Sequence, residues 1–283
     1  MRDLPTFIAL TTIMNHSKNK FNIEVNNNVE NFFSIEHYRQ QLSEDGNLTQ
    51  LKCQYSKTLP EINNENSGKF WDNKNFDHLI SEISNPMAWD RLMTAGSWIN
   101  KTPNIIDVLD IGIGSAELEQ ALYVKDYRLT GIDVSQKSLN EAKKRFKQFS
   151  FIKRDIVISP VGTNKFDLVV ALEVLEHIQP SKIFSVLSKI YKSLKSNGYF
   201  LCSVPLNEGL HALITKHNSN PNAHLREYTY PLITSELKIA GFSIIKSKTF
   251  FAFHNNYKLK SLISQFFFKN KANNVLILAQ KNG

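Results

Sequence analysis

Apolar residues along the chain occur in two patterns, and each predicts a kind of element. Strands are expected in the apolar run before Gly112, in the segment that ends at Asp133, and at residues 151–156, 166–178 and 198–205. The apolar run of the fourth is typical of a parallel strand buried on both faces. Between them, apolar residues recur every three or four positions, as they do on one face of a helix. Strands that alternate with helices predict an α/β fold with a doubly wound, mostly parallel sheet.

The helices expected between these strands each have one apolar face. After Ser135, apolar and basic positions take opposite faces: Leu139, Ala142, Phe146 and Phe149 against Lys137, Lys143, Lys144 and Lys147. We interpret the lysines as the solvated face of a sheet-covering helix; a phosphate-binding stripe is the alternative. Further helices are expected at residues 183–194 and from Pro231 to Ala240, the latter ended by Gly241 and preceded by Tyr228 and Thr229, which pack and cap it.

Near the end of the chain, another apolar stripe has the helical period over residues 257–268. Its members are Leu259, Leu262, Ile263, Phe266 and Phe267, flanked by Lys258, Lys260, Lys269 and Lys271. Packing against the edge of the sheet is the interpretation that we favour for this stripe. The alternatives are a lid over a lipophilic acceptor and a peripheral contact with an anionic membrane surface.

The chain divides near residue 70. Residues 1–70 contain polar, asparagine-rich segments such as 26–28 and 63–66, which would bury little surface. They form either a loosely ordered extension or a cap over a substrate, and the sequence leaves both open. Residues 71–283 form the predicted α/β domain, which opens with amphipathic helices that extend to Trp98.

A glycine-containing motif follows the first predicted strand. Asp110, Gly112 and Gly114 form an Asp-x-Gly-x-Gly sequence, in which the glycines let a ligand approach the backbone where a side chain would block it. Asp133 lies 23 residues after Asp110, at the end of the second strand, where a carboxylate can bind two ribose hydroxyls. The spacing therefore predicts a ligand that contains adenosine.

The residue at the third motif position indicates which ligand this is. Dinucleotide-binding folds have a third glycine there and direct a helix N-terminus at a pyrophosphate. This chain has Glu117 instead, and its carboxylate, together with that of Asp110, would repel a diphosphate. A ligand without phosphate and with a cationic end suits this site, and S-adenosylmethionine has both properties.

The order of these segments over residues 85–283 resembles the class I S-adenosylmethionine-dependent methyltransferases. The resemblance implies a seven-stranded sheet whose last strand, Asn274 to Lys281, is antiparallel. It also assigns binding roles along the cofactor. The methionine end would contact Asp110, Gly112 and Gly114, the ribose would contact Asp133 and Val134, the adenine would contact Asp155 and Ile156, and Glu173 would leave its strand facing the cofactor.

Two segments contain candidate catalytic residues. Glu173, Glu176 and His177 leave the fourth strand at its carboxyl end, where open α/β sheets bind ligands. His224 and Arg226 follow a long polar loop at residues 206–223, in which His211 and His217 are expected to be solvated. We expect His177 or His224 to be the base that deprotonates an acceptor. The alternatives are that Glu176 and His177 cap a helix, and that His224 and Arg226 pin the loop.

The Glu-x-x-Glu-His sequence at residues 173–177 resembles the ubiquinone-biosynthesis O-methyltransferases. With a distant histidine it also resembles the RNA 2′-O-methyltransferases, and that resemblance implies a divalent ion on Glu173, Glu176, His177 and His224. The spacing of aromatic and acidic residues around His224 departs from the RNA enzymes, so we expect no metal.

The prediction is methyl transfer from S-adenosylmethionine to a small-molecule acceptor at oxygen; the alternatives are a metal-dependent RNA methyltransferase and a non-catalytic S-adenosylmethionine-binding protein.

Composition limits the partners and the compartment. The formal net charge of +8 permits nucleic acid or an anionic membrane as a partner, but we favour a lysine-rich and asparagine-rich compositional bias as its explanation. The two cysteines, Cys53 and Cys202, form no disulfide framework or zinc motif. The apolar stretch from Pro5 to Met14 is too short to span a bilayer, and no cleavage site follows it. We expect a cytoplasmic protein without a transmembrane segment; its oligomeric state is open.

Overall fold

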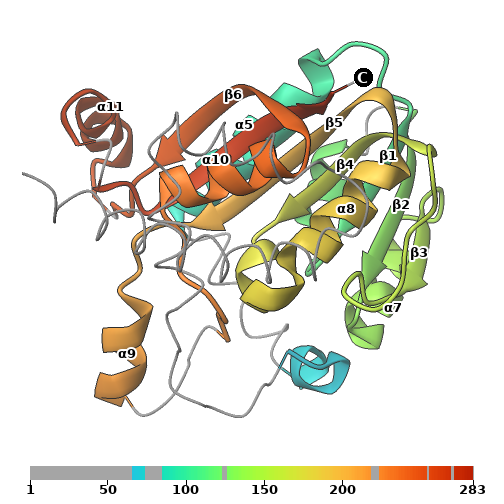
Figure 1. Cartoon of the computed structure of the whole chain (residues 1–283), viewed down its shortest axis with the longest axis horizontal. Coiled ribbons are helices and arrows are strands. Elements are labelled where there is room, and N and C mark those ends of the chain that lie inside the picture. Colours follow the sequence, from blue (N-terminus) through green and yellow to red (C-terminus); the bar gives the residue numbers. More distant parts are fainter. Residues whose placement is uncertain are drawn as a thin grey trace, which may run out of the picture.

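The fold is seen in a computed structural model of the chain (Figure 1). The structure describes residues 66–73, 85–122, 126–217, 223–253, 255–268 and 271–282. Most of the expected N-terminal extension, residues 1–65, therefore lies outside the described residues, and so does Cys53. The domain division near residue 70 stays a prediction.

A seven-stranded sheet forms the centre of the domain, in the order β3-β2-β1-β4-β5-β7-β6. Neighbouring strands are parallel except for β7, which is antiparallel to both β5 and β6. The strands are β1 (Asp107–Ile111), β2 (Arg128–Asp133), β3 (Ser150–Lys153), β4 (Phe166–Leu172), β5 (Leu194–Pro205), β6 (Phe242–Phe250) and β7 (Asn274–Lys281). The seven-stranded, mostly parallel sheet and its antiparallel last strand confirm the predicted fold class.

Helices cover both faces of this sheet and divide its core in two. One core lies under α5 (Pro86–Lys101), α6 (Glu117–Leu122) and α7 (Gln136–Arg145). The other lies under α8 (Ile183–Ser193) and α10 (Tyr230–Ile239). Two short 3₁₀ turns, η1 (Leu175–His177) and η2 (Pro180–Lys182), connect β4 to α8. The central strands β1 and β4 are buried from both sides, which explains their continuous apolar sequence.

Helix capping fixes where the main helices begin. The side chain of Asn85 accepts the first amides of α5, that of Ser135 accepts the amide of Ser138 in α7, and that of Thr229 accepts an amide of α10. Leu139, Ala142 and Phe146 are buried, while the α7 lysines opposite them are exposed. Tyr228 is fully buried before α10, so the predictions for these two helices are confirmed.

Three expectations from the sequence are wrong. The polar loop at residues 206–223 contains a helix, α9 (Leu210–His217), because Glu227 accepts the first amides at its N-terminus. The third strand ends at Lys153, since the chain then turns over the Asp155 side chain, which accepts the amide of Val157. The stripe at residues 257–268 forms α11 (Tyr257–Phe267), but its apolar side chains are exposed and do not pack in the core. Within the described part of the chain, every helix is too short or too polar to cross a membrane.

Candidate functional site

The glycine motif forms the turn that leaves β1 at the carboxyl edge of the sheet. Gly112 and Gly114 have positive φ angles of 75° and 52°, which L side chains rarely adopt. A Cβ atom on Gly112 would lie 2.7 Å from Cγ2 of Val174, so both the backbone angle and this close contact disfavour a side chain at this position. A Cβ atom on Gly114 would meet nothing within 4 Å. Open space therefore lies in front of Gly114, where a ligand can approach the backbone.

Asp133 ends β2 beside this turn and ties it to the next helix. One carboxylate oxygen accepts the amide of Gly114 at 3.1 Å, and the other accepts the amide of Ser135 at 2.7 Å. Burial raises the pKa of Asp133, and these two amides partly oppose that rise. The carboxylate that is predicted to bind the ribose thus holds the motif turn against the start of α7.

Asp110 is buried beside a second carboxyl group, that of Glu119 on α6. Burial raises the pKa of Asp110 to about 7, while a hydrogen bond from Glu119 lowers it. Burial and the charge of Asp110 raise the pKa of Glu119 well above its usual range. Among the described residues, the Glu119 oxygens meet no hydrogen-bond donor beyond its own backbone amide and the Asp110 carboxyl. The pair is therefore stable when Glu119 keeps its proton and donates it to Asp110.

Residues predicted to contact adenine follow β3. The Asp155 side chain accepts the amide of Val157 at 2.8 Å, and its carbonyl oxygen accepts the amide of Ser159 at 2.9 Å. Ile156 is buried, and its carbonyl oxygen accepts a hydrogen bond from Lys189 on α8. These bonds fix a compact turn beside the end of β2. The turn contains Asp155 and Ile156, the two residues that are predicted to contact adenine.

A short helix at residues 68–73 crosses the carboxyl edge of the sheet above β2. Its Asp72 side chain accepts the Ser135 hydroxyl at 2.7 Å and the Lys137 amide at 3.0 Å. A Cβ atom on Gly68 would clash with the carbonyl oxygen of Val134, so only glycine allows this close approach. The segment therefore lies on Val134, one of the residues predicted to bind the ribose.

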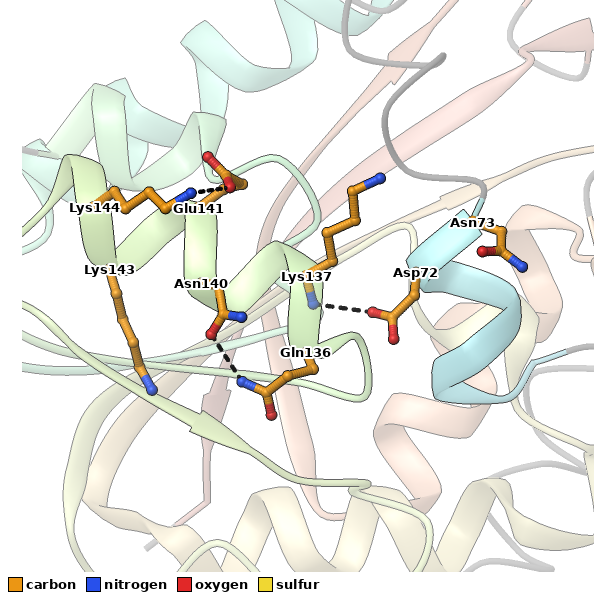
Figure 2. Close-up of a pocket in the computed structure, with 8 residues that line it drawn as sticks. All are labelled: Asp72, Asn73, Gln136, Lys137, Asn140, Glu141, Lys143 and Lys144. Carbon is orange, nitrogen blue, oxygen red and sulfur yellow. Dashed lines mark hydrogen bonds and ion pairs between the residues drawn. The ribbon is translucent and has the colours of Figure 1, made fainter.

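A surface hollow of about 670 Å³ separates this short helix from α7 (Figure 2). Polar side chains line it: Asp72, Asn73, Gln136, Lys137, Asn140, Glu141, Lys143 and Lys144. None of the predicted cofactor or catalytic residues is among them. We therefore place the candidate site at the glycine turn and the histidines, and not in this hollow.

Glu173, the first residue after β4, is held toward the β5 and β7 side of the sheet. Its carboxylate accepts the Ser203 hydroxyl at 2.7 Å and the Asn274 amide at 2.9 Å, and it pairs with Arg91 of α5 at 3.1 Å. Glu173 also has a positive φ of 55°, a conformation that costs energy in a residue other than glycine. The strained backbone and the three partners fix this carboxylate at the carboxyl edge.

Two histidines and one glutamate meet next to Glu173. Each of Glu176, His177 and His224 offers one ligand atom, and these atoms lie within 4.8 Å of one another. The two imidazole rings are in edge-to-face contact with centroids 4.9 Å apart, and Trp71 contacts His177 from the short helix. The structure thus brings together residues that lie 47 positions apart in the sequence.

The partners of both histidines indicate their tautomers. Nδ1 of His224 lies 2.8 Å from the Glu208 carboxylate, and Nδ1 of His177 lies 3.1 Å from the carbonyl oxygen of Ala223. An acceptor at Nδ1 requires a proton there, which leaves Nε2 as the basic nitrogen of each neutral ring. Each Nε2 atom is therefore suited to take a proton or to bind a metal ion.

Glu176 is the third member of this cluster and is fully buried. Among the described residues, its two carboxylate oxygens meet no hydrogen-bond donor, and burial and the charge of Glu173 raise its pKa well above the usual range. One carboxylate and two imidazole nitrogens form a donor set that divalent transition metals accept. Three of the four ligands considered from the sequence thus fit an ion, whereas Glu173 is engaged elsewhere.

Other candidates have structural roles. Arg226 is buried and forms an ion pair with Glu236 of α10, which also accepts the Tyr228 hydroxyl at 3.1 Å. Arg226 therefore pins the loop to α10, as the alternative interpretation held. His217 is exposed at the end of α9. Glu119 and Glu208 were not predicted from the sequence, because neither lies in a recognisable motif and each acquires its role only through its partner in space.

Known proteins share parts of this sequence. Residues 108–198 match the methyltransferase domain family. The chain is 31% identical over 136 residues to the carboxy-S-adenosyl-L-methionine synthase of Campylobacter jejuni subsp. doylei, a match that covers 45% of this chain and 56% of that protein. It is 29% identical over 130 residues to the ubiquinone biosynthesis O-methyltransferase of Dechloromonas aromatica, covering 44% and 53%. The chain thus spans about half the length of these curated relatives.

Solved structures share the fold. The N-methyltransferase NodS from Bradyrhizobium japonicum, in complex with S-adenosyl-L-homocysteine, has a TM-score of 0.59 and 16% identity; the match covers 77% of this chain and all of that one. The 1,6-didemethyltoxoflavin-N1-methyltransferase of Burkholderia thailandensis has a TM-score of 0.53 and 18% identity, covering 80% and 94%. Strand order, glycine turn and family match agree: residues 108–198 form a methyltransferase domain, and the whole sheet has the fold of these solved methyltransferases.

Proposed function

We propose that the protein transfers the methyl group of S-adenosylmethionine to an oxygen atom of a small-molecule acceptor. The observation that carries this proposal is the pair of Glu208 and His224, 2.8 Å apart, beside His177 at the carboxyl edge of the sheet. A hydroxyl acceptor must lose its proton during transfer, whereas many other acceptors need no base. An imidazole oriented by a largely buried carboxylate is suited to take that proton.

Bound S-adenosylmethionine supplies a methyl group on a sulfonium that is already a good leaving group. The chain's contribution is therefore to align the acceptor and remove its proton; alignment alone can supply about 7–11 kcal/mol of the barrier. Nε2 of His224 takes the hydroxyl proton as the acceptor oxygen bonds to the methyl carbon and the carbon–sulfur bond breaks. Glu208 stabilises the resulting imidazolium, since it accepts the Nδ1 proton.

The methionine end and the adenosine end of the cofactor meet different carboxyl groups. Asp110 faces the cationic end, where an ionised carboxylate is favourable, and Asp133 takes the ribose hydroxyls. The helix at residues 68–73 lies over Val134 and contacts His177 through Trp71, and it is suited to cover both bound molecules. Covering the site excludes water and strengthens these electrostatic interactions.

A second candidate function is RNA 2′-O-methylation with a divalent ion, and the cluster of Glu176, His177 and His224 is the observation that favours it. An ion held by these residues would bind a hydroxyl and lower its pKa. Both histidines donate Nδ1–H to an oxygen, which is also how metal-binding histidines are oriented. Chelation distinguishes the base from the ion, because only the ion is removed by it.

The function is tested with methyl-labelled S-adenosylmethionine and a panel of acceptors. Phenols and catechols with apolar tails, matched amines, and a 3′-terminal RNA oligonucleotide are compared at equal concentrations. We expect label in an O-methyl product of the phenols, and a loss of about 10²–10⁴-fold in rate for His224→Gln. Transfer to amines alone, or to RNA alone, would refute the proposal.

A further inference from the structure

Helix α11 has its polar and apolar faces inverted with respect to a normal surface helix. Ser261 and Ser264 are buried, with 6% and 7% exposure, whereas the large apolar side chains point to solvent. Phe266 and Phe267 are each 76% exposed, and four more exposed apolar residues accompany them: Leu259, Leu262, Ile263 and Phe268. A contiguous apolar surface of this kind marks an interaction site. We call these six residues the α11 surface.

The charge around the α11 surface has one sign. Residues 237–283 contain eight lysines and no aspartate or glutamate. The whole chain has 34 basic and 26 acidic residues, so the preceding residues carry equal numbers of both, and the entire excess of +8 lies in this C-terminal part. Lys258, Lys260 and Lys271 are exposed beside the apolar residues. A partner for this surface must therefore combine an apolar interior with negative charge.

The α11 surface and the candidate site both lie at the carboxyl end of the parallel strands. α11 connects the end of β6 with the start of β7, and the first residue of β7, Asn274, contacts Glu173. The Tyr257 hydroxyl donates to the Asp90 carboxylate of α5 at 3.0 Å, and the next residue, Arg91, pairs with Glu173. Figure 1 shows α11 projecting beyond the β6 edge of the sheet. The helix is thus anchored close to the site while its apolar face points outward.

We propose that the α11 surface inserts into the interface of an anionic membrane, with Lys258, Lys260 and Lys271 contacting lipid headgroups. An interfacial helix has apolar residues that enter the acyl boundary and lysines that remain at the headgroups, and α11 has both. A second copy of the chain fits poorly, because two such surfaces would bring their lysines together.

Membrane docking also indicates the acceptor class. The α11 surface and the candidate site both lie at the carboxyl end of the parallel strands, so docking presents the site to the bilayer. The acceptor is then a lipophilic hydroxyl compound dissolved in the membrane. This last step rests on the proposed methyl transfer. The docking itself does not, since it depends only on the exposed side chains and the charge.

The test is binding of the full chain to vesicles, measured by sedimentation without cofactor or acceptor. We expect binding to phosphatidylcholine vesicles that contain phosphatidylglycerol, weaker binding to phosphatidylcholine alone, and weakening by salt. The double variant Phe266→Ser/Phe267→Ser should lower the affinity about tenfold or more, because two large apolar groups no longer enter the membrane. The control is Ile158→Ser, which removes an equally exposed apolar residue that follows β3, the strand farthest from β6 in the sheet.

Three results would overturn docking: no sedimentation with anionic vesicles, an equal loss in Ile158→Ser, or a dimer that the phenylalanine variant dissociates while vesicles fail to bind. Methyl transfer to a water-soluble phenol is measured on the same variant and should be unchanged. If docking fails while that transfer proceeds, only this inference is wrong. If docking succeeds while no acceptor is methylated, the proposed function is wrong, but the proposal that the α11 surface docks on a membrane stands.

Discussion

Nδ1 of His224 lies 2.8 Å from a carboxylate oxygen of Glu208, although neither residue belongs to the glycine motif that identifies the domain. The pair joins the segment after β5 to the segment before α10, and the side chains of both residues are largely buried. A carboxylate in this position sets the tautomer of the ring and stabilises its protonated form. We infer that Glu208 positions the base and that His224 takes the proton.

Replacing the two members of this pair should have unequal effects on turnover. His224→Gln removes the base and should lower kcat about 10²–10⁴-fold. Glu208→Gln keeps the ring but replaces a charge-assisted hydrogen bond, worth about 1.5–3 kcal/mol, by a neutral one, and should lower kcat about tenfold or more with little change in KM. Steady-state kinetics over a range of pH measures both effects.

The control for this pair is Glu141→Gln, which removes an exposed carboxylate of α7 whose only described ion pair is with Lys144. Its kinetics should match those of the unmodified protein. If Glu208→Gln also behaves like the unmodified protein at every pH, Glu208 does not position the base.

Chelation distinguishes the base from a metal ion at Glu176, His177 and His224. If His224 is the base, a chelator should leave turnover unchanged, and His177→Ala and Glu176→Gln should have smaller, separate effects. If the three residues hold an ion, each substitution should abolish turnover alone, because a coordination shell acts as a unit. Turnover and melting temperature are measured after chelation and after addition of magnesium, manganese or zinc.

The expected result is no effect of the chelator and no rise in melting temperature with any of these ions. Loss of turnover in the chelator, restored by one ion, would replace the base by a metal-bound hydroxyl. His217→Ala provides the control, since this exposed histidine of α9 lies outside the cluster.

Asp133 should contribute to both cofactor affinity and stability, because its carboxylate already holds two backbone amides. Asp133→Ala should weaken S-adenosylmethionine binding at least about tenfold through lost hydrogen bonds to ribose. It should also lower the free energy of unfolding by about 1–3 kcal/mol for each amide left buried without an acceptor.

The variant Asp133→Asn separates the two contributions. Its amide oxygen can still accept one backbone N–H, so stability should fall less, while the loss of charge should still weaken cofactor binding. Calorimetry measures affinity, and denaturant unfolding measures stability. Wild-type affinity in both variants would remove Asp133 from the ribose site.

The sequence predicted the elements whose cause is local or periodic. β1 and β4 were recognisable because both faces are buried, and α7 and α10 because Ser135 and Thr229 cap helices with one apolar face. For α11, the period of the apolar residues correctly predicts a helix, but it does not say which face of that helix is buried. The helical period alone could not reveal that the serines face inward.

Part of the candidate site depends on contacts that only the fold creates. The sequence located Asp110, Asp133, His177 and His224, because they follow strands or lie in recognisable segments. It gave no signal for the partners that set their chemistry. Glu119 lies on a helix as an ordinary polar residue, and Glu208 lies in a loop; each acquires a role through a side chain far from it in sequence.

The buried pair of Asp110 and Glu119 should make stability depend on pH. Burial raises the pKa of Asp110 from 3.8 to about 7, so the folded protein binds more protons than the unfolded chain over this interval. The contribution of Asp110 to the free energy of unfolding should therefore fall as the pH rises from about 4 to about 7, and stay constant above that. Denaturant unfolding of the unmodified protein and of Asp110→Asn measures this contribution as a difference.

Cofactor binding should show the opposite dependence. The cationic end of S-adenosylmethionine favours the ionised Asp110, so affinity should rise with pH up to about 7, and binding below that pH should release a proton. Calorimetry in two buffers with different ionisation enthalpies measures the release. Glu119→Gln still donates a hydrogen bond to Asp110 and should keep the wild-type profile, whereas Glu119→Leu removes the donor and should move the rise in affinity to higher pH. If the leucine variant has the profile of the glutamine variant, Glu119 does not control the charge of Asp110, and the methionine end of the cofactor is bound by other groups.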